Sequence, residues 1–342
     1  MEAICVAVRI RPEAALAGSS IITSSDDLVS CVRVADAANK VTIACPARAC
    51  LGSTSQSVVA ESATHEFIFD RVFDAASRQE EVFTLVRPLV NAAADGYVAT
   101  VFAYGMTGSG KTHTISGTGG DVGMLPRAVS LLLDSLKADA AKGPQQTIFM
   151  VTISFVEIYN NTFVSLLSAP SATTDGNQKI EIRESPTRGV YLTGGTNLRL
   201  PVTCTEEAMQ LIHRGMEKRA TSCTNMNERS SRSHAILTFE VERSTASVRV
   251  GKLQLIDLAG SERVGLSGAE GSVLAEAQSI NLSLSLLGDV LSALSKYHRA
   301  VSKGLASATE RPFIPYRNSK LTHLLKDSLG GNCKTLMVCC IR

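Results

Sequence analysis

One segment constrains the fold of this chain more than any other. It is the eight-residue run Gly105-Met-Thr-Gly-Ser-Gly-Lys-Thr112. They fit the pattern G-x-x-x-x-G-K-[ST], in which glycines let successive backbone N–H groups turn towards phosphate oxygens. The run stands between a predicted strand over Tyr97–Ala103 and a predicted helix start, the context that this pattern requires. A glycine-rich turn with a solvated lysine is the alternative reading, but the context favours a phosphate-binding loop.

The residues of this loop have separate expected roles. The helix N-terminus adds partial positive charge, Lys111 reaches the β- and γ-phosphates of a nucleotide, and Thr112 ligates magnesium. The loop residues predicted to bind the nucleotide are Gly105, Met106, Thr107, Gly108, Ser109, Gly110, Lys111 and Thr112.

A second motif follows the apolar strand predicted over Lys252–Ile256, which ends at Asp257 and continues Leu-Ala-Gly260. A carboxylate at a strand end can hold the magnesium shell, and a glycine beside it can approach a γ-phosphate closely. An aspartate that only caps a strand is the plainer reading, since D-x-x-G alone is common. The phosphate-binding loop upstream favours the functional reading.

The rest of the chain reads as mixed α/β, with no internal repeat and no linker of low complexity, which favours one domain. Strands are predicted at Ile4–Ile10, Tyr97–Ala103, Thr147–Ile158, Ala235–Glu242 and Val248–Ile256, and helices at Arg78–Ala94, Glu206–Lys218, Ala275–Leu294 and Asn318–Leu329.

Composition excludes several classes of protein. With 44% hydrophobic and 19% charged residues among 342, the chain can bury a core, which argues against wholesale disorder. A net charge of +2 gives no global argument for nucleic acid or a membrane, and no signal peptide or 18-residue apolar run is visible. The nine scattered cysteines lack metal-binding spacing, so we expect reduced thiols. Without a visible signal peptide, the protein is expected to be cytosolic or nuclear, and its resemblance described below favours the cytoplasm.

A dense polar run, Asn227-Glu-Arg-Ser-Ser-Arg-Ser-His234, separates the two motifs. Together with the phosphate-binding loop and Asp257-Leu-Ala-Gly-Ser-Glu262, it resembles the motor domain of a kinesin. The likeness covers nearly the whole chain. Supporting segments occur in the family's order at Val8–Pro12, Phe69–Phe73, Phe102–Gly105, Glu157–Asn160, Ile280–Leu284 and Tyr316–Thr322.

The resemblance implies an α/β fold, a three-layer P-loop NTPase with a central mixed, mostly eight-stranded sheet flanked by helices. It also implies ATP on one side of the molecule and a microtubule-binding face on the other. The residues that match the adenine contacts of kinesins are Arg9, Pro12 and His113. ATP is expected rather than GTP, because the guanine-specific N-K-x-D signature is absent.

The resemblance also assigns roles around the reacting phosphate. Ser231 and Thr112 match positions that complete the magnesium shell, with Asp257 acting through water. Gly260 matches the γ-phosphate sensor, and Arg232 and Glu262 match a salt bridge that closes the two switch loops. Asn227 and Ser230 of the same motifs complete the expected catalytic set.

The expected track-binding surface departs from the family pattern. Tubulin's surface is acidic, yet Val264–Ser295 contains no Lys or Arg where kinesins usually carry several. A basic patch follows, opposed mainly by Glu310, so we predict weak, salt-dependent microtubule binding; an ordinary solvated charge run is the alternative. The basic residues predicted to bind microtubules are Lys296, Arg299, Lys303, Arg317, Lys320 and Lys326, and Arg311 lies among them.

Compared with kinesins, the sequence stops inside the expected last core strand, before the final helix and neck linker, and it has no heptad repeat for a coiled coil. Two functions stay open. One is an ATPase that couples Mg-ATP hydrolysis to microtubule binding and movement. The other is a kinesin-like nucleotide-binding module without motility, acting as a microtubule-associated or scaffold protein.

Overall fold

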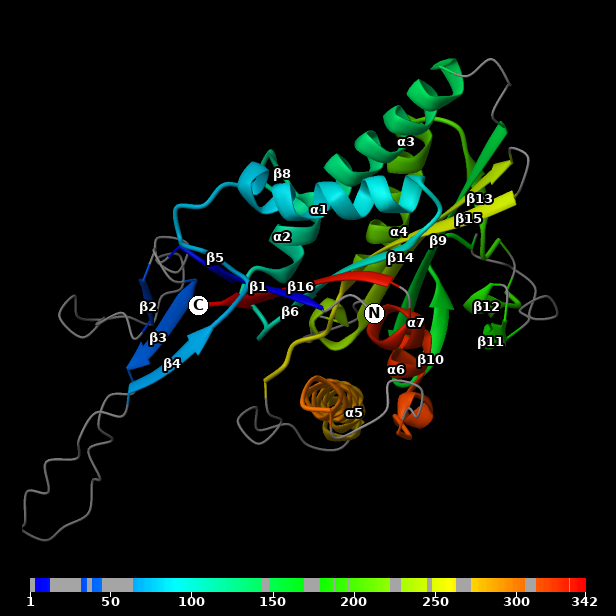
Figure 1. Ribbon diagram of the computed structural model, residues 1–342. Helices are drawn as coiled ribbons and strands as arrows, with labels where there is room; N and C mark the ends of the chain where they lie inside the picture. The colour runs from blue at the N-terminus through cyan, green and yellow to red at the C-terminus, as the bar shows by residue number, and fades with distance from the viewer. Residues whose placement is uncertain are drawn as a thin grey trace, which may run out of the picture.

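A mixed sheet runs through the centre of the computed structural model and, within the described residues, contains nine strands (Figure 1). The structure describes residues 4–12, 32–35, 39–44, 64–142, 148–168, 179–186, 188–195, 197–221, 229–244, 248–262, 272–304, 312–331 and 333–342. The strands of the sheet are β1 (Cys5–Ile10), β5 (Arg71–Phe73), β6 (Val98–Tyr104), β9 (Ile148–Tyr159), β10 (Thr162–Ser165), β13 (Leu200–Val202), β14 (His234–Ser244), β15 (Val248–Asp257) and β16 (Cys333–Ile341).

Eight of these strands follow the order β10-β9-β14-β15-β6-β16-β1-β5, and β13 pairs with β9. The half from β15 to β5 is parallel, whereas β9, β10, β13 and β14 pair antiparallel. In the parallel half Asp257 is registered with Ala103, so β6 and β15 end side by side. The loops that carry the two motifs therefore leave the sheet at the same edge.

Helices cover both faces of the sheet, as Figure 1 shows. One face carries α1 (Gln79–Ala94), α2 (Lys111–Ser116), α3 (Met124–Lys142) and α4 (Thr205–Thr221). The other carries α5 (Ser272–Ser302), α6 (Lys320–Leu324) and α7 (Lys326–Gly330). This arrangement confirms the predicted three-layer α/β fold.

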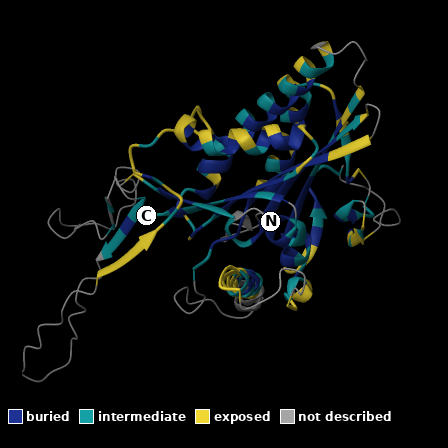
Figure 2. Ribbon diagram, viewed as in Figure 1, coloured by how far each residue is buried: buried dark blue, intermediate teal, exposed yellow. Residues whose placement is uncertain are grey.

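Each helix layer buries an apolar stripe against the sheet (Figure 2). In α1, Val82, Val86 and Val90 recur at helical spacing and are fully buried. In α5, Leu287 and Val290 are buried in the same way. Because burying one such side chain contributes about 1.5–3 kcal/mol, these stripes hold the helices in place against the sheet.

Shorter elements surround this frame. The hairpin β11–β12 lies on the α5–α7 side of the sheet, where Val190 and Leu192 join the core. The remaining elements are β2 (Val32–Ala35), β3 (Lys40–Ala44), β4 (Thr64–Ile68), β7 (Gly117–Thr118), β8 (Asp121–Val122), β11 (Glu181–Ser185), β12 (Gly189–Thr193) and the 3-10 turns η3 (Arg229–Arg232) and η5 (Tyr316–Asn318).

The predicted elements are confirmed with two exceptions. Helix α5 continues past the predicted end at Leu294, because buried Tyr297 extends its apolar face. The single helix predicted over Asn318–Leu329 was wrong, since the segment divides into η5, α6 and α7. Ser319 starts α6 by accepting the N–H of Thr322 at 3.0 Å, and Leu325 separates α6 from α7.

No helix in the described ranges combines the length and the apolar character needed to span a bilayer.

Candidate active site

The loop between β6 and α2 has a backbone that only glycine adopts without strain at three positions. Gly105 has φ +153°, Gly108 has φ +75° and Gly110 has φ +101°. At Gly105 a Cβ would overlap the carbonyl oxygen of Cys340 in the neighbouring strand. The three glycines thus let the loop fold tightly over the end of the sheet, and its last residues enter α2.

Lys111 lies beneath this loop and is 7% exposed. Its Nζ donates to the carbonyl oxygens of Gly105 and Met106, each at 2.9 Å. Burial lowers the pKa of Lys111, and the carboxylates of Asp257 and Glu262 oppose that shift. A cation held among loop carbonyls in this way is placed to meet an anionic ligand at the same loop.

Thr112 and Asp257 meet across the ends of the two motifs. The Thr112 hydroxyl donates to Asp257 Oδ2 at 2.9 Å, and the aspartate is 7% exposed. Its other oxygen, Oδ1, is buried and has no hydrogen-bond partner among the described residues. An unsatisfied buried carboxylate oxygen is costly, so this atom fits a hydrated cation.

The donor set at this point suits magnesium. In the described part of the chain no group of three or more His, Cys, Asp or Glu side chains gathers to hold a metal. A site built here would use hydroxyl oxygens, one carboxylate and water, which are ligands that Mg²⁺ prefers.

Arg219 of α4 forms an ion pair with Asp257. No role for this arginine was predicted from the sequence. Its Nη1 lies 3.2 Å from Asp257 Oδ2 and its Nε lies 3.9 Å from Glu157 Oε1. Its Nη2 also donates to the carbonyl oxygen of Ser233 at 3.0 Å. The sequence held a signal: Arg219 continues the apolar stripe of α4, so its side chain is directed inwards where a cation needs carboxylates.

Glu262 joins the second motif to the phosphate-binding loop. Its carboxylate accepts the Thr107 N–H at 2.9 Å and also the Thr107 hydroxyl. Burial raises the pKa of Glu262, but the hydrogen bonds from Thr107 outweigh this and hold it below its ordinary value. The structure thus assigns Glu262 a partner that the sequence did not predict.

Backbone bonds tie the loops together around Gly260. The Gly260 N–H donates to the Ser231 carbonyl oxygen at 2.8 Å, and the Ser261 N–H donates to that of Gly105 at 3.1 Å. A Cβ at Gly260 would overlap the side chains of Thr107 and Glu262, so glycine is required by close approach. Arg232, at the end of η3, lines a small pocket nearby, and its predicted bridge to Glu262 stays a prediction.

The three residues expected at adenine line one pocket of about 130 Å³, next to Ser109 and Gly110 of the loop. They are Arg9, Pro12 and His113. The pocket therefore adjoins the phosphate-binding loop, as a nucleotide base and its phosphates require.

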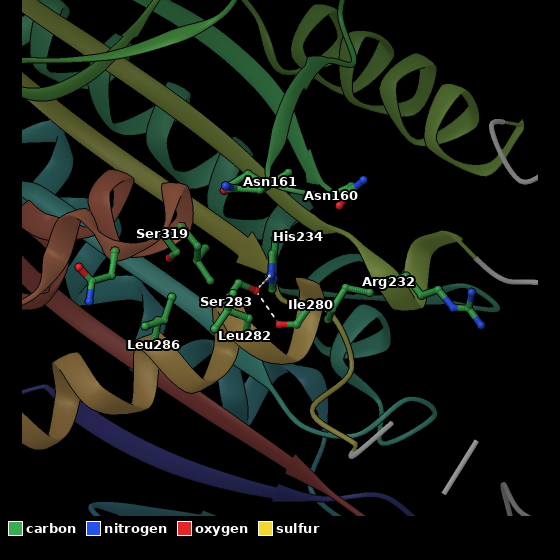
Figure 3. A pocket seen from close by; sticks show the side chains of 12 residues that line it. Asn160, Asn161, Arg232, His234, Ile280, Leu282, Ser283, Leu286 and Ser319 are labelled. Atoms are coloured by element: carbon green, nitrogen blue, oxygen red, sulfur yellow. Dashed lines mark hydrogen bonds between the residues drawn. The ribbon is translucent and has the colours of Figure 1, made fainter. Parts of the chain in front are cut away.

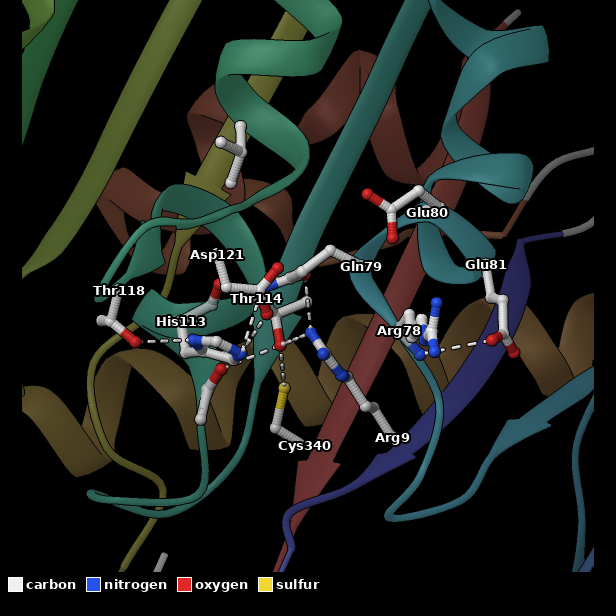
Figure 4. Close-up of polar contacts among 12 residues, drawn as sticks. Arg9, Arg78, Gln79, Glu80, Glu81, His113, Thr114, Thr118, Asp121 and Cys340 are labelled. Atoms are coloured by element: carbon white, nitrogen blue, oxygen red, sulfur yellow. Dashed lines mark hydrogen bonds and ion pairs between the residues drawn. The ribbon is translucent and has the colours of Figure 1, made fainter.

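A hydrogen-bond chain orders this pocket, as Figure 4 shows. Arg9 Nη1 donates to Gln79 Oε1 at 2.9 Å and to the Thr114 hydroxyl at 3.0 Å. Gln79 Nε2 donates to the His113 carbonyl oxygen at 2.9 Å and lies 3.0 Å from its ring Nε2. Burial and the charge of Arg9 lower the pKa of His113. Gln79 was missed, because nothing local distinguishes it from an ordinary helix start.

Two predicted catalytic residues have no described side chain. Asn227 lies outside the described residues, and Ser230 lies in η3 without a described side chain.

The basic residues expected to meet the track form two groups, with Lys320 apart from both. Lys296, Arg299 and Lys303 are exposed at the end of α5. Lys320 has its ammonium 5.2 Å from the centre of the Phe163 ring.

The second group is held by Glu184 of β11. Arg317 Nη2, His323 Nε2 and Lys326 Nζ lie 3.0, 2.6 and 2.5 Å from its oxygens. The bonds from Lys326 and His323 lower the pKa of Glu184 to about 2. Glu184 thus opposes part of the patch, whereas Glu310, expected to be its main acidic neighbour, and Arg311 lie outside the described residues.

Comparison with known proteins identifies the arrangement. The chain matches the kinesin motor domain family over residues 19–342. It is 46% identical over 275 residues to the kinesin-like protein KIN-14I of Oryza sativa subsp. japonica, covering 80% of this chain and 20% of that protein. The chain thus spans about a fifth of that relative's length.

Two solved structures agree with it in fold. A fast kinesin superposes with a TM-score of 0.74 at 32% identity, over 99% of this chain and 85% of its own. KIF14 was solved as a dimer with AMP-PNP in complex with a microtubule. It gives a TM-score of 0.79 at 30% identity, over 99% of this chain and 88% of the KIF14 chain.

Proposed function

Because this chain belongs to the kinesin motor-domain family, we propose that it hydrolyses ATP and couples hydrolysis to microtubule binding and movement. The observation that carries the proposal is the contact of Thr112 with Asp257, beside the buried Asp257 Oδ1. It joins a phosphate-binding loop and a carboxylate at one sheet edge, as nucleotide hydrolysis with Mg²⁺ needs.

The residues of the loop would hold the triphosphate. Backbone N–H groups of residues 105–112 and the ammonium of Lys111 would neutralise its oxygens, while Thr112 and Ser231 would ligate Mg²⁺ and Asp257 would hold it through water. When bound, Mg²⁺ would supply neutralisation of the negative charge on the phosphates. Arg9, Pro12 and His113 would enclose adenine in the adjoining pocket.

Hydrolysis needs a positioned water and compensation of the charge that develops on the transferred phosphoryl group. We assign these tasks to the loops around Gly260, and we assign Gly260 itself the role of γ-phosphate sensor. Arg232 and Glu262 close over the nucleotide, and Ser230 and Asn227 help to hold the water and the phosphate. The hydrogen bond from the Gly260 N–H to the Ser231 carbonyl oxygen supports joint movement of the two loops.

The proposed partner is the microtubule, which places the protein at the cytoskeleton of the cytoplasm. KIF14, a structural neighbour, was solved on a microtubule, which supports this partner. We assign contact to the exposed Lys296, Arg299 and Lys303, with smaller shares for Lys320, Arg317 and Lys326. A nucleotide-binding module without motility is the second candidate; it would bind microtubules without stimulated turnover.

Steady-state phosphate release with and without microtubules separates these candidates. We expect basal ATP turnover that microtubules accelerate, and Lys111→Ala should abolish binding of a fluorescent ATP analogue because the phosphates lose their cation. Lys137→Ala on the exposed face of α3 is the matched control. Unchanged analogue affinity in Lys111→Ala would contradict the nucleotide assignment, and turnover without acceleration would favour the second candidate.

A further inference from the structure

His234 ends the polar motif and begins β14, yet none of the roles above uses it. The ring is buried, with 2% of its residue surface exposed. Figure 3 shows it between the strand end and helix α5. Its Nδ1 lies 3.0 Å from the N–H of Ala259, and its Nε2 lies 2.8 Å from Ser283 Oγ.

These distances fix the tautomer of the ring. Because Nδ1 accepts the Ala259 N–H, the ring proton is on Nε2 and is donated to Ser283. The Ser283 hydroxyl then donates to the carbonyl oxygen of Ile280 at 2.7 Å. Burial lowers the pKa of His234 to about 3, and the charges of Arg219 and Lys111 act in the same direction. The ring is therefore neutral, and both of its nitrogens are satisfied.

The ring contacts two elements with different tasks. Ala259 directly precedes Gly260, whose N–H is bonded to Ser231 in the other loop. Ser283 belongs to α5, whose far end exposes Lys296, Arg299 and Lys303. The hydrogen bonds of one side chain therefore connect the loop at the γ-phosphate position to the helix that carries the basic patch.

We infer that His234 is a positioning residue that couples the Asp257–Gly260 loop to helix α5, so that microtubule contact at the helix sets the loop for hydrolysis. The inference rests on the proposed function and adds a residue and a route to it. The bonds are directional, and a buried partner left unpaired is costly. A shift of Ala259 therefore either turns the ring and moves Ser283 with it, or breaks a bond, which favours two discrete arrangements over gradual slippage.

The first test removes the helix end of the connection. Ser283→Ala should leave basal ATP turnover within about twofold, because Ser283 touches no nucleotide-binding residue described above. Acceleration by microtubules should fall about tenfold, the factor that corresponds to losing one net hydrogen bond. Ser283→Thr keeps the hydroxyl and should recover the acceleration. Ser285 is exposed on the same helix, so Ser285→Ala is the matched control and should behave like the wild-type protein.

A double-mutant cycle with His234→Asn tests whether the two residues act together. Asn offers an acceptor near the position of Nδ1 but is too short to reach Ser283. The losses of acceleration in His234→Asn and Ser283→Ala should therefore not add, and the double variant should match the worse single one. Additive losses, or undiminished acceleration in Ser283→Ala, would overturn the coupling.

One measurement needs no variant. In the ¹⁵N spectrum of the histidine-labelled chain, His234 should show its proton on Nε2 and no titration between about pH 5.5 and 8. A proton on Nδ1, or a ring that titrates there, would overturn the hydrogen-bond route even if a variant failed to fold. If the unchanged chain shows no acceleration by microtubules, the proposed function fails instead, whatever the spectrum shows.

Discussion

Glu262 is bonded to Thr107, the third residue of the phosphate-binding loop, through both the backbone N–H at 2.9 Å and the side-chain hydroxyl. A carboxylate that ties two loops together in this way holds the second motif against the first. If Glu262 also pairs with Arg232 during turnover, its carboxylate either accepts from Arg232 in addition to Thr107 or exchanges one for the other. The closed arrangement then changes the hydrogen-bond partners of this one side chain.

The first prediction concerns this change of partners. Glu262→Ala and Arg232→Ala should each retain ATP and slow hydrolysis by at least about 100-fold, since a group that positions water or stabilises developing charge is lost. Analogue binding and single-turnover hydrolysis measure the two effects separately. Thr107→Ser, which keeps both donors to Glu262, is the control and should stay near the unchanged rate. Normal turnover in both alanine variants would show that the two side chains do not form a closing bridge.

The second prediction concerns the support beneath Asp257. Arg219→Met removes a buried cation from between Glu157 and Asp257 and leaves two buried carboxylates without it. The free energy of unfolding should fall by about 3–5 kcal/mol, as for other broken buried ion pairs. Urea unfolding measures this. Arg214→Met, exposed on the same helix, should change it by less than about 0.5 kcal/mol. Equal stability of the two variants would refute the supporting role.

The third prediction is a pH dependence at Glu184. Its pKa is lowered from 4.5 to about 2 in the folded chain, so its stabilisation is present above pH 4.5 and is lost as the pH falls towards 2. Glu184→Gln should lower the unfolding free energy at neutral pH by about 1 kcal/mol, the scale of exposed ion pairs.

The pH profile of thermal unfolding checks this assignment. The difference between the unchanged chain and Glu184→Gln should shrink between about pH 4.5 and 2. Glu181→Gln on the same strand serves as the control. A difference that stays constant through this range would mean that Glu184 does not hold its cations by charge.

The contact of Thr112 with Asp257 could be anticipated from the sequence, because Thr112 follows the loop after one recognisable strand, Asp257 lies at the end of another, and neighbouring parallel strands end together. The contact of Glu184 with Lys326 could not. These residues are 142 positions apart, and the hairpin that carries Glu184 is placed by tertiary contacts. Lys252 donates to the carbonyl oxygen of Val190, and the N–H of Val190 donates to Asp327. No pattern in the neighbouring sequence indicates either bond.

Arg219 and Gln79, which hold site residues in place from other elements, were not predicted from the sequence for a related reason. Helical periodicity marks the position of Arg219 as buried but does not say which carboxylates it meets. Gln79 orders Arg9 and His113 only because the assembled fold brings the start of α1, the end of β1 and α2 together.

The last prediction concerns the track. The end of α5 exposes Lys296, Arg299 and Lys303, whereas Glu184 holds Arg317 and Lys326. Charges already paired attract a further acidic surface less strongly, so the α5 group should carry most of the attraction. Replacing its three residues by Ala should abolish cosedimentation with microtubules at low salt.

The same attraction should fade with salt in the unchanged chain, because the Debye length shrinks to about 8 Å at physiological ionic strength. Arg87, Lys137 and Arg214 are exposed on helices of the opposite face, so replacing them by Ala removes equal charge and is the matched control. If net charge alone drove binding, both triple variants would lose it equally. Pelleting that survives the α5 replacements and added salt would place the track contact on other residues.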